Sequence, residues 1–198
     1  MIIIQLHNIV KEERAVRQIE HSADFCVIGG GMAGIAAALA AARHGAKTVL
    51  IQDRGVLGGN ASSEVRMWIC GAHGQDNRET GIIEELMLEN FYSNPGLSYP
   101  LWDATLFGKV AFQENLTLLL NTSCLDADCE GGHITSVRAW QSPAETMHTV
   151  RARYFADCSG DSILAPLTGA RYRYGREARS EFDESIEPET ADRKTMGM

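Results

Sequence analysis

The sequence predicts an α/β fold built on a parallel sheet, and three observations support this prediction. A short apolar run ends in a glycine cluster, and an alanine-rich helical pattern follows it directly. A second run, Thr48–Ile51, suits a strand that is buried on both faces, as strands of parallel sheets are. Further strand-like runs, separated by turn signals, lie in the second half of the chain and predict an inserted antiparallel meander.

The first strand and the helix after it flank the most informative motif. Asp24 precedes the apolar run Phe25–Ile28, and the cluster Gly29-Gly30-Gly31-Met32-Ala33-Gly34 has G-x-G-x-x-G spacing. Alanines dominate Met32–His44, so we expect this helix to pack against the sheet, with Gly45 as a left-handed C-cap. A strand that turns sharply into a helix directs backbone N–H groups at one spot, which suits a pyrophosphate.

The three glycines of this motif have separate predicted roles. Gly29 permits the tight turn, Gly31 lets the backbone approach the phosphates, and Gly34 lets the helix pack closely on the strand. Met32 and Ala33 lie between them and are candidate cofactor contacts.

Periodicity and turn signals predict the remaining elements. Helices are expected over Thr80–Phe91 and Trp102–Phe112, and strands over Leu116–Leu120, Ile134–Trp140 and Val150–Phe155. We interpret the last two strands as the antiparallel insertion beside the parallel sheet.

The chain is expected to divide into three parts. Residues 1–23 form an N-terminal extension with a helix-compatible stretch, Lys11–Glu20, and residues 24–170 form the main domain. Residues 171–198 form a charged tail, which we expect to be loop or loosely packed helix after Arg176.

Composition narrows the class of protein. The chain has 198 residues and a net charge of −8, which argues against nucleic-acid binding because no basic surplus is present. The sequence shows neither a signal peptide nor a run of the ~20 apolar residues that a membrane span needs. The five cysteines are odd in number and lack C-x-x-C spacing, which predicts buried free thiols rather than disulfides or a metal site. We therefore expect a cytoplasmic protein with no membrane partner.

The end of the second strand bears on which dinucleotide binds. An acidic side chain there usually accepts hydrogen bonds from ribose hydroxyls. Counting from Gly45, this position falls on Gln52, with Asp53 one residue later, and either would contact the adenosine ribose. Arg54 is interpreted as a solvated loop charge, with an NADP 2′-phosphate contact as the alternative.

Two later motifs favour a flavin over a nicotinamide cofactor. The pair Gly58-Gly59, followed by Asn60, lies just after the second strand, where side chains would obstruct the cofactor. The segment Asp157-Cys158-Ser159-Gly160-Asp161 follows an apolar strand and is similar to the D-A-T-G-D segment found late in FAD-binding domains. A simple turn for the first motif and a helix N-cap for the second are the alternative interpretations.

Together these motifs resemble the FAD-dependent oxidoreductase family related to the succinate dehydrogenase and fumarate reductase flavoproteins. The resemblance covers about residues 24–198 and includes the run Gly58–Glu64 with Arg66 and Trp68. It implies a Rossmann-like FAD-binding domain in which FAD is lined by Gly29, Gly31, Gly34, Gly58, Gly59 and Asp161. The full set of candidate cofactor-binding residues adds Met32, Ala33, Gln52, Asp53, Arg54, Asn60, Cys124 and Gly160.

The resemblance implies an enzyme that transfers a hydride between a small-molecule substrate and FAD. The alternatives are an NAD(P)-dependent dehydrogenase and a non-catalytic dinucleotide-binding module. No catalytic residue can be assigned, but we hypothesise that Arg66 or His73 tunes the flavin or contacts substrate, with an ordinary loop histidine as the favoured interpretation of His73. Met67-Trp68-Ile69 is expected to be core.

Members of this family are usually much longer than 198 residues. We therefore expect a fragment that lacks a substrate or cap domain. Its expected partners are the small-molecule substrate and either that domain or further copies of the same chain.

Overall fold

The computed structural model describes residues 16–72, 74–75 and 77–194. Its first half contains β1 (Arg17–Ile28), α1 (Met32–Arg43), β2 (Thr48–Ile51), the 3-10 turn η1 (Gly59–Ala61), α2 (Ile82–Ser93) and α3 (Tyr99–Ala111). Its second half contains β3 (Leu116–Leu119), β4 (Thr122–Glu130), β5 (His133–Gln141), η2 (Ser142–Ala144), β6 (Thr146–Asp157), α4 (Leu164–Thr168) and α5 (Arg179–Phe182).

The strands form one mixed sheet in the order β3-β2-β1-β6-β5-β4. Strands β3, β2, β1 and β6 run parallel to one another, whereas β5 runs antiparallel to both β6 and β4. The predicted combination of a parallel sheet with an antiparallel meander is therefore confirmed. Strand β6 belongs to both parts, so the meander continues the parallel sheet rather than standing beside it.

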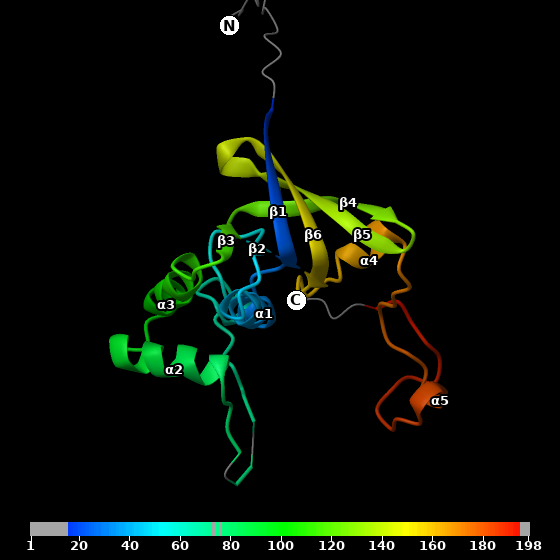
Figure 1. Ribbon diagram of the computed structural model, residues 1–198. Helices are drawn as coiled ribbons and strands as arrows, with labels where there is room; N and C mark the ends of the chain where they lie inside the picture. Colours follow the sequence, from blue (N-terminus) through cyan, green and yellow to red (C-terminus); the bar gives the residue numbers. More distant parts are fainter. Residues whose placement is uncertain (1–15, 73, 76, 195–198) are drawn as a thin grey trace, which may run out of the picture.

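One face of the parallel strands packs on helices. Val27 of β1 and Leu50 of β2 share a buried cluster with Ile35 and Leu39 of α1 and with Leu106 of α3. Figure 1 shows α1, α2 and α3 gathered on one side of the molecule, away from β4, β5 and α4. The alanines of α1 bring this helix close to the sheet, as the sequence predicts.

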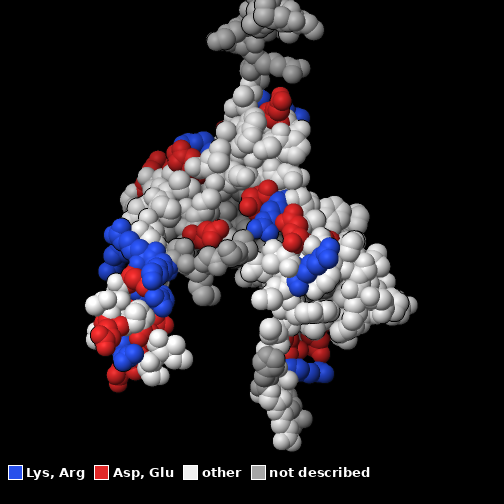
Figure 2. Space-filling view, turned by 180° about the vertical axis from the view of Figure 1, so that it is seen from behind, with Lys and Arg blue, Asp and Glu red and all other residues white. Residues whose placement is uncertain are grey.

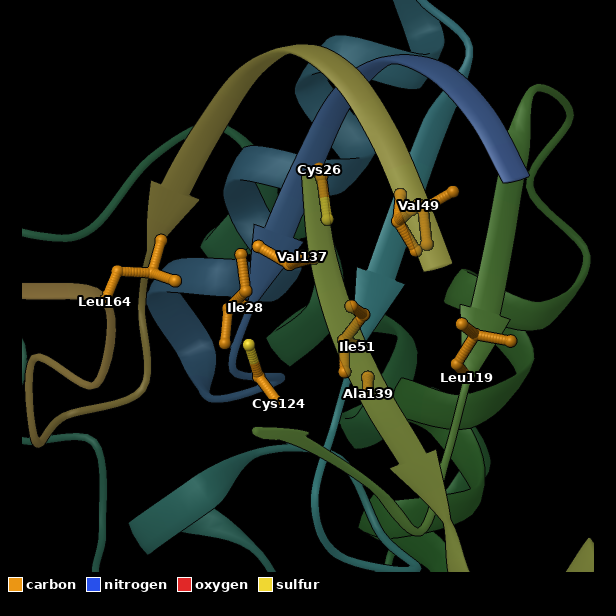
Figure 3. Close-up of a cluster of buried hydrophobic side chains, with 10 residues drawn as sticks. Cys26, Ile28, Val49, Ile51, Leu119, Cys124, Val137, Ala139 and Leu164 are labelled. Atoms are coloured by element: carbon orange, nitrogen blue, oxygen red, sulfur yellow. The ribbon is translucent and has the colours of Figure 1, made fainter. Parts of the chain in front are cut away.

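The meander covers the opposite face of the same strands. Figure 3 shows Cys26 and Ile28 of β1 and Ile51 of β2 pointing toward Val137 and Ala139 of β5, which crosses over them. The sheet therefore curls back on itself and buries a second apolar cluster, to which Leu164 of the short helix α4 also contributes. Strands β1 and β2 are therefore packed on both faces, which fixes the positions of their carboxyl ends.

Strand β1 is longer than the sequence predicts, and the expected helical character of residues 17–20 is wrong. These residues are strand because β6 pairs with them, with Ile19 opposite His148 and Arg17 opposite Thr146. Cross-strand packing here overrides a charge pattern that suits a helix. Residues 11–15 of the expected stretch lie outside the described residues.

Strand β4 was not predicted, because acidic residues interrupt its apolar pattern. Asp126 and Asp128 point to Arg138 on the adjacent strand β5 and form ion pairs with it. Paired charges across neighbouring strands compensate one another, so the segment is a strand despite its composition.

Acidic and basic side chains are interspersed on the face shown in Figure 2, and both signs gather over the C-terminal segment around α5 at its lower left. Within that segment, ion pairs join Arg173 to Glu181 and Arg176 to Asp192. After Arg176 we expected loop or loosely packed helix, and the described residues there are loop apart from α5, which spans four residues and buries none of them.

All five cysteines are free, and their burial differs from the prediction in part. Cys26 and Cys124 are buried, but Cys70 and Cys129 are exposed. Burial raises the pKa of the Cys124 thiol to about 11. Among the described residues, no three acidic, histidine or cysteine side chains form a group that could hold a metal ion. No helix within those same residues is long and apolar enough to cross a membrane.

Candidate functional site

A large cleft of about 830 Å³ lies at the carboxyl ends of the parallel strands. The chain leaves β1 toward β2 on one side and later returns to β6 on the other, so the cleft opens at a point where strand order reverses. Such switch points are the usual ligand sites of parallel sheets. All but one of the candidate residues line it: Gly29, Gly31, Met32, Ala33, Gln52, Asp53, Arg54, Gly58, Gly59, Asn60, Cys124, Gly160 and Asp161.

The remaining candidate, Gly34, faces the protein. A Cβ atom on Gly34 would lie 1.8 Å from the carbonyl oxygen of Gly29. A Cβ atom on Gly29 would lie 2.4 Å from the carbonyl oxygen of Cys158, and Gly29 has a φ of +101° that favours glycine. These two glycines are therefore required by close backbone packing among β1, α1 and the chain after β6.

Gly31 faces the cleft. Its φ of −69° is open to any residue, and no atom of the described protein lies within 4 Å of the position a Cβ would take. The glycine is thus not required by the fold. Its lack of a side chain keeps the start of α1 open, and the first N–H groups of a helix have no partner within the helix. This helix end carries a partial positive charge that suits an anion.

Gln52 occupies the position at the end of β2 where an acidic residue is usual. Its side chain is buried, with only 4% of the residue exposed. The Oε1 atom accepts a hydrogen bond of 2.7 Å from the Gly30 N–H, and Nε2 donates one of 3.0 Å to the Val56 carbonyl. Gln52 therefore joins the glycine loop to the segment after β2, and its amide is already engaged within the protein.

Asp53 and Arg54 extend from the same strand end. Asp53 is exposed and lines the cleft, so its carboxylate is placed to accept hydrogen bonds from hydroxyl groups of a ligand. Arg54 also lines the cleft, and its guanidinium pairs with Glu64 at 3.2 Å. The predicted solvated loop charge is therefore a surface ion pair.

The second glycine motif lies against the first. The Gly58 N–H donates a hydrogen bond of 2.8 Å to the Gly30 carbonyl, and Gly31 and Gly58 form an isolated parallel bridge. Gly58 has a φ of +107°, and a Cβ there would lie 2.9 Å from Leu106 of α3. The pair Gly58-Gly59 thus holds a bare stretch of backbone beside the start of α1.

The chain after β6 closes the other side of the cleft. The Cys158 N–H donates to the Ile28 carbonyl at 2.7 Å, which extends the pairing of β6 with β1. Asp157 accepts hydrogen bonds from both the N–H and the hydroxyl of Ser159, and from the Leu164 N–H at the start of α4. Asp157 therefore fixes this turn, and Asp161 at its rim offers a second carboxylate to the cleft.

Two of the sequence-based hypotheses about the segment after Gly59 need revision. Met67, Trp68 and Ile69 line the cleft. Met67 and Trp68 are 62% and 64% exposed, so the expectation that they are core is wrong for these two, whereas the half-buried Ile69 packs against the core as expected. Arg66 does not line the cleft; its guanidinium lies 5.7 Å from the centre of the Tyr99 ring. His73 lies outside the described residues.

Sequence reasoning also missed part of the lining at the start of β4. Thr122, Ser123 and Leu125 line the cleft together with the predicted Cys124. The sequence position of these residues could have identified them, because they directly follow β3 and so lie at the carboxyl edge of the sheet, where ligands bind. They were missed because strand β4 was not predicted.

Comparisons with known proteins bear on the family and on the fold. A family model described as FAD dependent oxidoreductase matches residues 24–197. The FAD complex of glycerol-3-phosphate dehydrogenase from Bacillus halodurans aligns with a TM-score of 0.51 and 15% identity, covering 84% of this chain and 44% of that protein. The flavin-dependent monooxygenase PieE, solved with FAD and substrate, aligns with a TM-score of 0.51 and 16% identity, covering 79% of this chain and 33% of that one.

These alignments show a shared fold. The chain spans less than half the length of either enzyme. A search of curated protein sequences finds no match.

Proposed function

The chain belongs to the FAD-dependent oxidoreductase family, and we propose on that premise that it binds FAD across the carboxyl edge of its sheet. The observation that carries this proposal is the open space at Gly31, where the start of α1 meets the cleft. The predicted residues from three separate strand ends line the same cleft, which suits an extended dinucleotide better than a compact ligand.

The lining residues fit the successive parts of FAD. The start of α1, with Gly31 and the bare backbone at Gly59, would hold the pyrophosphate. Asp53 would accept hydrogen bonds from the adenosine ribose, because the Gln52 amide is already engaged with Gly30 and Val56. Asp161 lies on the other side and would accept hydrogen bonds from hydroxyl groups of the ribityl chain.

We further propose that the chain takes part in hydride transfer between a small-molecule substrate and the flavin, which is the chemistry that bound FAD supplies. The protein's own residues bind and orient the cofactor and exclude water from the lined part of the cleft.

The proposal is tested by identifying the bound nucleotide. The 198-residue chain would be purified and denatured, and the supernatant analysed by absorbance and mass spectrometry. Titration calorimetry of the cofactor-free protein would then compare FAD with NADP. We expect FAD to bind and NADP to bind far more weakly. Binding of NADP without FAD would overturn the proposal and favour a role for Arg54 at a 2′-phosphate.

A second measurement separates an enzyme from a binding module. The FAD-loaded chain would be mixed without oxygen with candidate donors, and loss of the oxidised flavin absorbance would be followed. Reduction by a donor supports the proposed hydride transfer, whereas bound flavin that no donor reduces favours a non-catalytic module.

A further inference from the structure

The cleft has an exposed aromatic wall that the proposed function does not yet explain. Trp68 is 64% exposed, although indole is the largest apolar side chain in proteins. Trp68 lines the cofactor cleft, and it also lines a smaller apolar pocket of about 60 Å³ between the cleft and helices α2 and α3. The tryptophan thus stands between the two hollows.

The backbone on which Trp68 stands is held in place from two sides. The Met67 N–H donates a hydrogen bond of 2.8 Å to the Asn60 carbonyl, which ties the segment to the glycine pair. On the other side, two side chains of α3 donate hydrogen bonds to this segment. The Tyr99 hydroxyl donates to the Arg66 carbonyl at 2.9 Å, and the Trp102 indole N–H donates to the Ala61 carbonyl at 3.0 Å. A backbone anchored in this way suits a binding surface better than a loop tip.

The Trp68 ring already has one aromatic neighbour. Its centre lies 5.8 Å from that of Tyr99, with the two rings inclined by 52°. Such tilted contacts are favourable aromatic geometry. Tyr99 contacts the indole from the helix side, and Trp68 still lines the cleft.

The direction of the cofactor assigns a role to this ring. The adenosine half lies toward the end of β2, because the ribose position is at Gln52 and Asp53. The other half must then extend from the start of α1 along the rest of the cleft, whose lining includes Asn60, Trp68 and Gly160. Resting on the proposed function, we propose that Trp68 forms part of the binding surface for the isoalloxazine half of FAD.

The test compares FAD with ADP, which contains the pyrophosphate and adenosine but no flavin. Calorimetry would measure both ligands on the wild-type chain and on Trp68→Ala, Trp68→Phe and Tyr92→Ala. Tyr92 is an exposed aromatic of α2 that lines neither hollow, so its variant is the matched control. Thermal unfolding would verify that each variant is folded.

The inference predicts a loss that is specific to the flavin half. The dissociation constant for FAD should rise about tenfold in Trp68→Ala, and less in Trp68→Phe, which keeps a ring. The dissociation constant for ADP should stay unchanged, and Tyr92→Ala should match the wild type with both ligands.

Two results would overturn the inference and leave the proposed function intact. One is FAD binding that does not respond to Trp68→Ala, and the other is an equal loss of affinity for FAD and ADP. A wild-type chain that binds ADP but not FAD would instead overturn the proposed function, and the inference with it.

Discussion

The two ends of the strand pair β1 and β6 use their polar groups in opposite ways. At the carboxyl ends the backbone of the glycine loop and the Asp161 carboxylate are left facing a cleft. At the amino-terminal halves, which rise together at the top of Figure 1, His21 and His148 are hydrogen-bonded to each other at 2.9 Å. His148 is only 3% exposed and is bonded to Gln141 as well.

Within this pair of strands, polar groups that stabilise the fold therefore lie at one end and polar groups that can bind a ligand lie at the other. A buried polar group is normally satisfied by a partner inside the protein, and the histidine pair follows that rule. The groups at the carboxyl ends are open to a ligand, and open polar groups at a switch point are typical of a binding site. Substitutions at the two kinds of position should therefore affect different properties.

The largest effect is expected at Gly34, which belongs to the carboxyl end but faces the protein. In Gly34→Ala the new Cβ would lie 1.8 Å from the Gly29 carbonyl oxygen, so α1 and β1 would have to separate. We expect a loss of more than about 3 kcal/mol in the free energy of unfolding. Urea denaturation would measure it.

Gly108 of α3 provides the control for this substitution. A Cβ on Gly108 would meet no atom of the described protein within 4 Å. Gly108→Ala should therefore raise stability by roughly 0.5–1 kcal/mol, because alanine loses less backbone entropy in a helix. Equal stability of the two variants would contradict the packing role of Gly34.

A smaller effect is expected at Gln52, whose amide is satisfied within the protein. Gln52→Glu would keep an acceptor for Gly30 but would face the Val56 carbonyl with a carboxylate that cannot donate. We expect a loss of about 1–3 kcal/mol near pH 7, measured by urea denaturation. The loss should shrink toward pH 5, where a protonated glutamate can donate again.

The neighbouring Asp53 tests whether this effect is specific to burial. Asp53→Asn replaces a carboxylate with an amide at an exposed position, the reverse of the change in Gln52→Glu. The free energy of unfolding of this variant should therefore change by less than about 0.5 kcal/mol. A gain in stability from Gln52→Glu would show that the bond to Val56 contributes nothing.

The sequence predicted local backbone geometry better than it predicted the extent of the strands. The glycine spacing reports directly on local backbone packing, so Gly29 and Gly34 could be given roles that their surroundings match. By contrast, residues 17–20 of β1 are strand only because β6 lies beside them, which no local pattern records. The exposure of Trp68 likewise depends on where α3 holds its backbone.

Gly31 tests the open side of the glycine loop. In Gly31→Ala the φ of −69° suits alanine and the new methyl group meets no described atom, so the fold should be unaffected. The methyl group would occupy the space proposed for the pyrophosphate. We expect an unchanged melting temperature and an affinity for FAD at least about tenfold lower, or roughly 1.4 kcal/mol, by calorimetry. Unimpaired FAD binding would place the pyrophosphate elsewhere.

The smallest effect is expected at the histidine pair, where the variable is pH. Burial lowers the pKa of both His21 and His148, with Lys47 acting on the first and with His21 and Arg17 acting on the second. The folded state therefore favours neutral rings, whereas an unfolded histidine binds a proton below about pH 6.5. Stability from this pair is present above that pH and is lost as the pH falls below it.

Urea denaturation at about pH 7.5 and about pH 5.5 would measure this loss, before carboxylates titrate. Glu85 has a pKa lowered to about 2 by its hydrogen bond with Arg43, so its contribution is lost only at more acidic pH. His148→Gln should reduce the difference in stability between the two pH values, because the buried ring that resists protonation is removed. An undiminished difference in that variant would assign the pH dependence to groups outside the pair. FAD affinity should be the same in His148→Gln as in the wild type, since the histidines lie at the end of the strands away from the cleft.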